Sequence, residues 1–227
     1  VRSVIEQIQL TSVRGGRQVV LIHPAESMNL QAANGLLKIL EEPPENVVFL
    51  LVTDTRDKLL PTIKSRCRQM VLPAPSYQQS LDYLAQQQTE NAEALLAFHG
   101  GAPLFENQPE QDALRAQLLD ILSAPRLLSL LDYAADFDKQ KWPLAVFLDW
   151  LHKWLLDVGL AQQNISPLYY PNQNQKLAAI GHKTSPAALF KLIGRLNNLS
   201  PYGYHTLSVK MQLESLLIDY LKFWQNK

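Results

Sequence analysis

Two short apolar runs separated by one amphipathic segment constrain the fold of the first third of the chain most strongly. The runs cover residues 19–22 and 47–52, and continuous β-branched and apolar residues between turn signals predict strands buried on both faces. Between them, residues 30–40 place leucine and alanine at helical spacing. Pro43-Pro44 ends this helix, because proline lacks an N–H and disfavours helix in the residue before it. The alternation predicts right-handed crossovers in a parallel sheet.

Further elements are expected on both sides of this unit. Residues 1–10 predict a helix by the spacing of their apolar residues, and a glycine turn follows at residues 14–17. After the second strand, we expect a short helix over residues 61–65 and a third strand over residues 68–72. Because the chain opens with Val1 inside an expected helix, we interpret it as a fragment of a longer protein.

Helical periodicity dominates after Pro73 and Pro75 interrupt the strand pattern. Residues 76–87 and 92–98 predict two short helices in a small helical module over residues 73–107. From Pro109 onwards the pattern is helical to the end of the chain, with a loop at residues 164–175. Helices are expected around residues 114–122, 127–134, 147–158, 189–196 and 207–224. The predicted fold class is therefore α/β plus all-α, with an α/β unit over residues 1–72 and a helical domain over residues 108–227.

Composition excludes several classes of protein. Lys+Arg and Asp+Glu both number 21, whereas a chain that binds DNA over its whole surface would be basic; any DNA contact is expected to be local or shared with partner chains. The single cysteine, Cys67, can form neither an internal disulfide nor a zinc site alone, which favours a cytoplasmic location. No apolar run approaches the ~20 residues of a membrane helix, and the 5 histidines show no metal-binding spacing.

Three stretches carry a resemblance because they occur together and in order. They are residues 19–26 (VVLIHPAE), 34–44 (NGLLKILEEPP) and 60–67 (LPTIKSRC). This order resembles the AAA+ clamp-loader family, in which a leucine-rich helix ending in Glu-Glu-Pro-Pro accompanies a Ser-Arg-Cys signature. The resemblance is strong over residues 1–72.

The resemblance implies an architecture and a set of partners. Residues 1–72 would be the C-terminal part of an AAA+ parallel-sheet module, residues 73–107 a helical lid, and residues 108–227 an all-helical collar for oligomerisation. The AAA+ and collar domains would bind other clamp-loader subunits, both the ATPases and the clamp-opening subunit, and primed DNA would be contacted only within the assembly. Collar association could use an apolar face formed by Phe147, Trp150 and Trp154, or these residues could be buried within the domain.

The resemblance also implies that this subunit hydrolyses no ATP itself. Its first strand corresponds to the Walker B strand, which in hydrolysing members is followed by an Asp-Glu pair that serves Mg²⁺ and the attacking water. His23 and Pro24 stand at those positions, and neither supplies a carboxylate. Glu26 lies too far along the turn to substitute. Thr53 matches the polar sensor position of the family, or is equally a plain strand end.

Arg66 is the residue to which the resemblance assigns a direct role. In the family, the arginine of Ser-Arg-Cys reaches the γ-phosphate of ATP held by a neighbouring subunit, and a planar, permanently charged guanidinium suits that task. Ser65 would tie the local turn and Cys67 would fill a small buried space, both as structural support. The alternative for Arg66 is an ordinary surface salt bridge.

Glu41 and Glu42 end the amphipathic helix, where the macrodipole disfavours negative charge. Two interpretations are open. The carboxylates are tolerated in solvent, or they form an acidic patch that faces a partner subunit.

Three other functions compete with a non-hydrolysing clamp-loader subunit. An ATP-hydrolysing subunit of the same family is one, and His23-Pro24 argues against it. A helical adaptor protein is another, which failure to co-purify with replication proteins would favour. An AAA+ helicase loader or Holliday-junction motor would share the fold but not the pairing of Glu-Glu-Pro-Pro with Ser-Arg-Cys.

The missing nucleotide chemistry gives a first prediction. The chain contains no Gly-x-x-x-x-Gly-Lys-Ser/Thr loop and no Walker B carboxylates, so we expect no cofactor, no ATPase activity and no measurable affinity for Mg-ATP. Isothermal titration of this chain with Mg-ATP tests the expectation, and binding in the micromolar range would contradict it.

Overall fold

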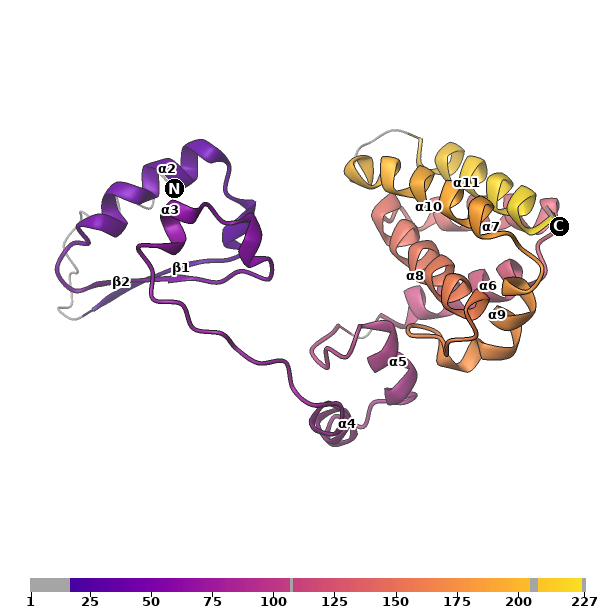
Figure 1. Ribbon diagram of the computed structural model, residues 1–227, viewed down its shortest axis with the longest axis horizontal. Helices are drawn as coiled ribbons and strands as arrows, with labels where there is room; N and C mark the ends of the chain where they lie inside the picture. Colours follow the sequence, from indigo (N-terminus) through magenta and orange to yellow (C-terminus); the bar gives the residue numbers. More distant parts are fainter. Residues whose placement is uncertain (1–16, 107, 205–207, 226–227) are drawn as a thin grey trace. The chain divides into compact units, whose positions relative to one another are not determined.

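The computed structural model describes residues 17–106, 108–204 and 208–225. The chain divides into two compact units, with the boundary between Pro73 and Ala74 (Figure 1). The predicted helix over residues 1–10 and most of the glycine turn at 14–17 lie outside the described residues.

The first unit contains two strands and the helices that connect them. Strand β1 (Gln18–Ile22) leads through α2 (Leu30–Glu41) to β2 (Val47–Leu51), and α3 (Pro61–Lys64) follows. The strands pair in parallel, with Gln18 opposite Val47 and Ile22 opposite Leu51. The predicted order of strand, helix and parallel strand is confirmed. Figure 1 shows α2 and α3 on the same side of the two strands.

Local capping explains where α2 begins. Asn29 is the N-cap of α2, and its side-chain oxygen accepts the N–H of Ala32 at 2.8 Å. Ala33 and Leu36 supply the buried positions of α2 and Ile63 that of α3.

The prediction that both strands are buried on two faces is wrong for the described structure. Burial alternates along each strand, and on the open face Val19 and Leu21 are 61% and 63% exposed. The reason is the number of layers: helices cover one face, and among the described residues no second layer covers the other. A continuous apolar run therefore did not reveal which face is covered.

The predicted third strand at residues 68–72 is also wrong. Residues 68–76 have no regular secondary structure, and Met70, Val71 and Leu72 are largely exposed. A strand requires a neighbour that pairs with its N–H and C=O groups, and neither described strand pairs with this segment. Apolar composition predicted the strand, but the pairing partner decides whether it forms.

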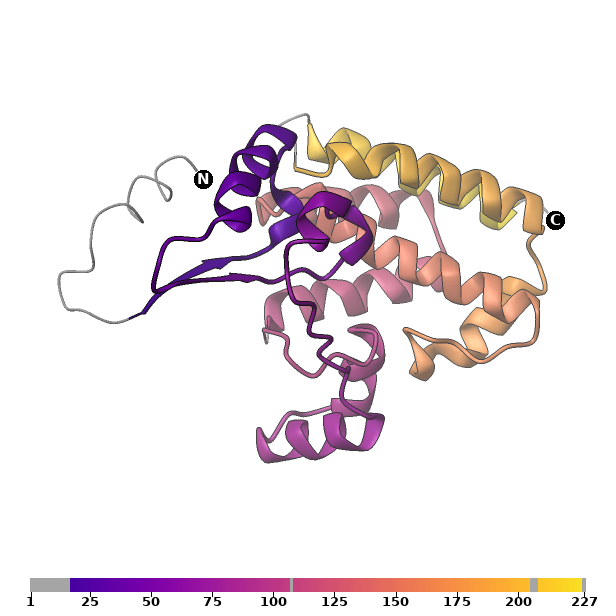
Figure 2. The ribbon, with the colours of Figure 1, turned by 60° about the vertical axis from the view of Figure 1, so that its left-hand side comes forward.

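The second unit is helical throughout. It contains two short helices, α4 (Tyr77–Gln86) and α5 (Ala92–Phe98), followed by α6 (Pro109–Ser123), α7 (Leu127–Lys139), α8 (Leu144–Gln162), α9 (Asn174–Gly181), α10 (Pro186–Leu199) and α11 (Val209–Gln225) (Figure 2). The predicted helices are confirmed, but α9 was not predicted, and it begins inside the expected loop. None of the helices in the described ranges combines the length and apolar character that a membrane crossing requires.

Helix α8 supplies much of the core of this unit. Phe147, Trp150 and Trp154 are all buried within it, so the interpretation that they lie inside the domain is confirmed. The indole N–H of Trp154 donates to the hydroxyl of Tyr220 at 2.9 Å, and that hydroxyl donates to the carbonyl of Leu122 at 2.8 Å. This chain of hydrogen bonds connects α8, α11 and α6 and leaves neither polar side-chain group unpaired in the core.

The short helices α4 and α5 are attached to the larger bundle through Phe98, the last residue of α5. Its ring belongs to the same hydrophobic cluster as the α8 residues. The guanidinium carbon of Arg115 lies 3.7 Å from the ring centroid and the ammonium of Lys153 lies 3.9 Å from it, which adds cation–π attraction to burial. Gly100 and Gly101 end α5 with φ of 64° and 87°, conformations that glycine adopts without steric cost. A separate lid over residues 73–107 stays a prediction.

Asp157 is a buried carboxylate of α8 that organises the loop before α9. Its two oxygens accept the backbone N–H groups of Leu168, Tyr169 and Tyr170 at 2.7–3.2 Å. Burial raises the pKa of Asp157 above its ordinary value, and the three amides act in the opposite direction. A single side chain thus satisfies three consecutive N–H groups of a loop.

This arrangement predicts an unusual sensitivity at Asp157. Asp157→Asn replaces one acceptor oxygen by an NH₂ donor that faces backbone donors, so we expect a loss of about 1–3 kcal/mol in the free energy of unfolding. The control is Asp149→Asn on the same helix, where the exposed carboxylate of Asp149 makes an i,i+4 pair with the half-buried Lys153, and its loss should cost about 0.3–0.5 kcal/mol. Urea denaturation measures both, and equal midpoints for the two variants would contradict the assigned role of Asp157.

Candidate functional site

The Ser-Arg-Cys segment begins where the single turn of α3 ends. Pro61 occupies the first turn of α3, a position where its missing N–H costs nothing. Ile63 is buried and holds the turn in the core of the first unit. The N–H of Arg66 then donates to the carbonyl of Ile63 at 3.1 Å, so the backbone at Arg66 is held by the turn that precedes it.

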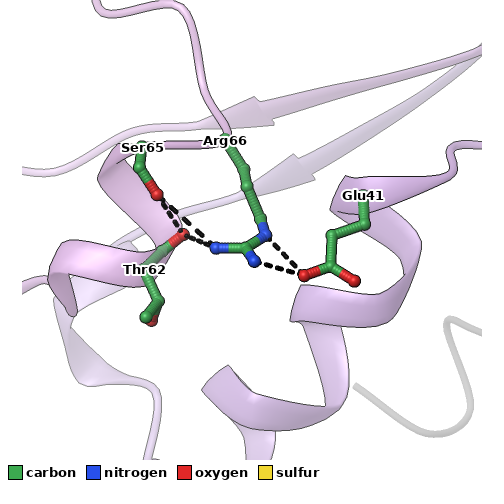
Figure 3. A network of polar contacts seen from close by, with 4 residues as sticks. All are labelled: Glu41, Thr62, Ser65 and Arg66. Atoms are coloured by element: carbon green, nitrogen blue, oxygen red, sulfur yellow. Dashed lines mark hydrogen bonds and ion pairs between the residues drawn. The ribbon is translucent and has the colours of Figure 1, made fainter.

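The guanidinium of Arg66 extends from this turn to the end of α2 (Figure 3). Its Nε donates to Oε1 of Glu41 at 2.8 Å, and its Nη2 makes an ion pair with the same oxygen. Its Nη1 donates to the carbonyl of Thr62 at 2.9 Å and lies 3.5 Å from Oγ of Ser65. The side chains of Arg66 and Glu41 are 32% and 49% exposed, so the pair is accessible to solvent and to a partner.

The two residues beside Arg66 differ in their contacts and burial. The hydroxyl of Ser65 donates to the carbonyl of Thr62 at 3.0 Å, the same oxygen that Arg66 contacts. Cys67 is a half-buried free thiol whose pKa is raised by burial, and a thiol of raised pKa is a poor nucleophile at neutral pH. The supporting roles of Ser65 and Cys67 toward Arg66 remain predictions.

A second polar cluster lies where the two strands end. The backbone continues the sheet there, with the N–H of Ala25 donating to the carbonyl of Val52 at 2.8 Å. Glu26 accepts the N–H of Asp54 at 3.2 Å. The hydroxyl of Thr53, followed by nearby backbone groups, holds the pKa of Glu26 below its ordinary value. The carboxylate that sequence reasoning set aside thus contacts the backbone that follows β2.

The residues at the expected Walker B positions are exposed. His23 and Pro24 are joined by a cis peptide bond and lie directly after β1. Among the residues that the structure describes, no group of three His, Cys, Asp or Glu side chains could hold a metal ion.

Sequence reasoning found Arg66, Ser65 and Cys67 but not the partner of Arg66. It left Glu41 between solvent and an acidic patch, and the structure shows Glu41 half-exposed and paired with Arg66. The only sequence signal was that each residue lies at or just after the end of a helix of the same α/β unit. Side chains 25 residues apart are brought together by tertiary structure.

The guanidinium of Arg66 can bind an anion without breaking its contacts with Glu41 and Thr62. Glu41 uses the Nε–Nη2 edge of the guanidinium and Thr62 uses one N–H of Nη1. Nη1 also contacts Oγ of Ser65. A guanidinium has five N–H groups, so these contacts leave at least one N–H, on Nη2, without a partner in the described part of the chain. Such a donor can meet an oxygen of a phosphate or carboxylate.

Known proteins resemble this chain over different parts of its length. A family described as DNA polymerase III, delta subunit, matches residues 1–76. DNA polymerase III subunit delta′ of Pseudomonas aeruginosa is 39% identical over 165 residues, which cover 70% of this chain and 50% of that protein. DNA polymerase III subunit tau of Escherichia coli is 42% identical over 78 residues, which cover 34% of this chain and 12% of tau.

One relative matches nearly the whole chain. DNA polymerase III subunit delta′ of Yersinia pestis is 32% identical over 241 aligned residues, which cover 99% of this chain and 69% of that protein. The chain spans about half the length of the first relatives, those of Pseudomonas aeruginosa and Haemophilus influenzae. Because this identity extends through the α/β unit and the helical unit alike, the chain belongs to the DNA polymerase III subunit delta′ family.

Proposed function

We propose that this chain is part of a subunit that works in the clamp loader of DNA polymerase III, hydrolyses no ATP itself, and supplies Arg66 to the ATP site of a neighbouring subunit. In this proposal residues 1–72 form the C-terminal part of an AAA+ module. Residues 73–107 form its lid, and residues 108–227 form a collar that joins the subunits.

The observation that carries the proposal is the state of the Arg66 side chain. It lies on an exposed turn, it is ordered by Glu41, Thr62 and Ser65, and it keeps an N–H of Nη2 available for an anion. A γ-phosphate held by a neighbour presents oxygens that such a donor can bind, and the charge that develops during phosphoryl transfer strengthens the interaction.

The absence of hydrolysis is supported at the end of β1. Mg²⁺ requires oxygen ligands in near-octahedral geometry, and His23 and Pro24 offer none from their side chains. The nearest carboxylate along the chain, Glu26, is engaged by Asp54 and Thr53. A subunit built in this way would act on ATP only in trans.

The proposed partners follow from the relatives and from the charge. The tau subunit of Escherichia coli matches 34% of the length of the present chain. Homologous subunits commonly associate through equivalent surfaces. With 21 basic and 21 acidic residues, the chain has no overall positive field that would hold DNA by itself. We therefore propose that primed DNA is bound only by the complete assembly.

Substitution of Arg66 tests the proposal in full-length protein reconstituted with its ATPase partners, the clamp and primed DNA. We expect Arg66→Ala to leave assembly intact and to slow hydrolysis at the served site by a factor of about 10³ or more. Clamp loading and DNA-stimulated hydrolysis should fall strongly, although other sites retain their own arginines. Arg66→Lys should recover little, because an ammonium lacks the planar fork.

Two controls separate this effect from damage to the fold. Arg66→Ala should change the free energy of unfolding by no more than about 1 kcal/mol, because the pair with Glu41 is half-exposed. Arg68→Ala removes an exposed arginine from the same segment and should behave like the wild type. Clamp loading at the wild-type rate by an assembled Arg66→Ala complex would show that Arg66 is not a finger.

A further inference from the structure

Glu41 contacts the guanidinium of Arg66 along one edge only. Both Nε and Nη2 direct a hydrogen at a single oxygen, Oε1 of Glu41. Nη1 contacts Thr62 and Ser65, and the second N–H of Nη2 is left over (Figure 3). We infer that Glu41 is a positioning residue for Arg66, which orders the guanidinium so that its unpaired edge is presented to an anion on a neighbouring subunit. This inference rests on the proposed function.

Ordering the side chain in advance has a physical benefit. A free arginine samples many rotamers and must lose that freedom when it binds a phosphate. Glu41 and the carbonyl of Thr62 fix the guanidinium from two directions before any partner arrives. The loss of freedom then occurs during folding instead of during the approach to the transition state.

The opposite role would be a latch, in which Glu41 withholds Arg66 from a partner. Two observations argue against it. Carboxylate and phosphate would bind different edges of the guanidinium, so neither has to displace the other. Moreover, both side chains are partly exposed, and an ion pair of this kind changes an equilibrium by a factor of only about five or less. A triphosphate carries more charge than a carboxylate and would outcompete so weak a latch.

The location of Glu41 fits a role that depends on Arg66. Glu41 is the last residue of α2, where the helix macrodipole disfavours a carboxylate and favours a cation. The guanidinium beside it offsets that disadvantage. Glu42 follows it and is exposed, and within the described residues Arg66 contacts Glu41 and not Glu42. The chain therefore provides a matched control one residue away.

Substitutions in the full-length subunit, reconstituted with its ATPase partners, the clamp and primed DNA, test the inference. We expect Glu41→Ala to lower kcat for DNA-stimulated ATP hydrolysis at the served site about fivefold with little change in KM for ATP, because the contact matters in the transition state. Glu41→Gln should recover most of the rate, since its amide oxygen can still accept both N–H groups. Glu42→Ala should match the wild type.

The double variant connects the effect to Arg66. If Glu41 acts through Arg66, Glu41→Ala combined with Arg66→Ala should be no slower than Arg66→Ala alone. An impaired Arg66→Ala complex with a Glu41→Ala complex at or above the wild-type rate would overturn the inference and leave the proposed function standing. Equal losses in Glu41→Ala and Glu42→Ala would also overturn it, because the cause would be charge at the helix end. A wild-type rate for Arg66→Ala would instead overturn the proposed function itself.

Discussion

Strands β1 and β2 pair in parallel over residues 18–22 and 47–51, and the candidate site depends on this pairing. Two parallel neighbours can be connected only by a chain that returns from one end of the sheet to the other, and α2 is that return. The pairing therefore fixes where α2 ends, with Glu41 in its last turn, relative to the turn of α3 that follows β2. The ion pair between Glu41 and Arg66 is therefore a consequence of sheet topology, and local sequence patterns do not predict it.

The same topology separates two kinds of polar chemistry. At the carboxyl ends of the strands, Glu26 is engaged with Asp54 and Thr53, and no Walker B carboxylate is present. At the end of α2, Arg66 retains a donor that can reach outward. In the proposed function, a unit that hydrolyses no nucleotide itself supplies a side chain that acts on one held by a neighbour, and this separation of the two clusters is its physical basis.

The helical unit pairs several polar groups inside a large apolar core. Trp154 and Tyr220 pair with each other and with the carbonyl of Leu122, and Asp157 satisfies three loop amides at once. These interactions cost little only while they are complete, because an unpaired group in such a core is expensive. A proposed collar benefits from this rigidity, since it would have to hold several subunits in register.

The sequence by itself determined the order of strand, helix and strand, most helices of the second unit, and the motif that contains Arg66, because each depends on periodicity, caps and spacing within a few residues. It did not reveal that one sheet face is open at Val19 and Leu21, that residues 68–72 form no strand, or that Glu41 is the partner of Arg66. Only tertiary structure decided these, because the covering of a face, the pairing of a strand and an ion pair between residues 41 and 66 all depend on segments far apart in the chain.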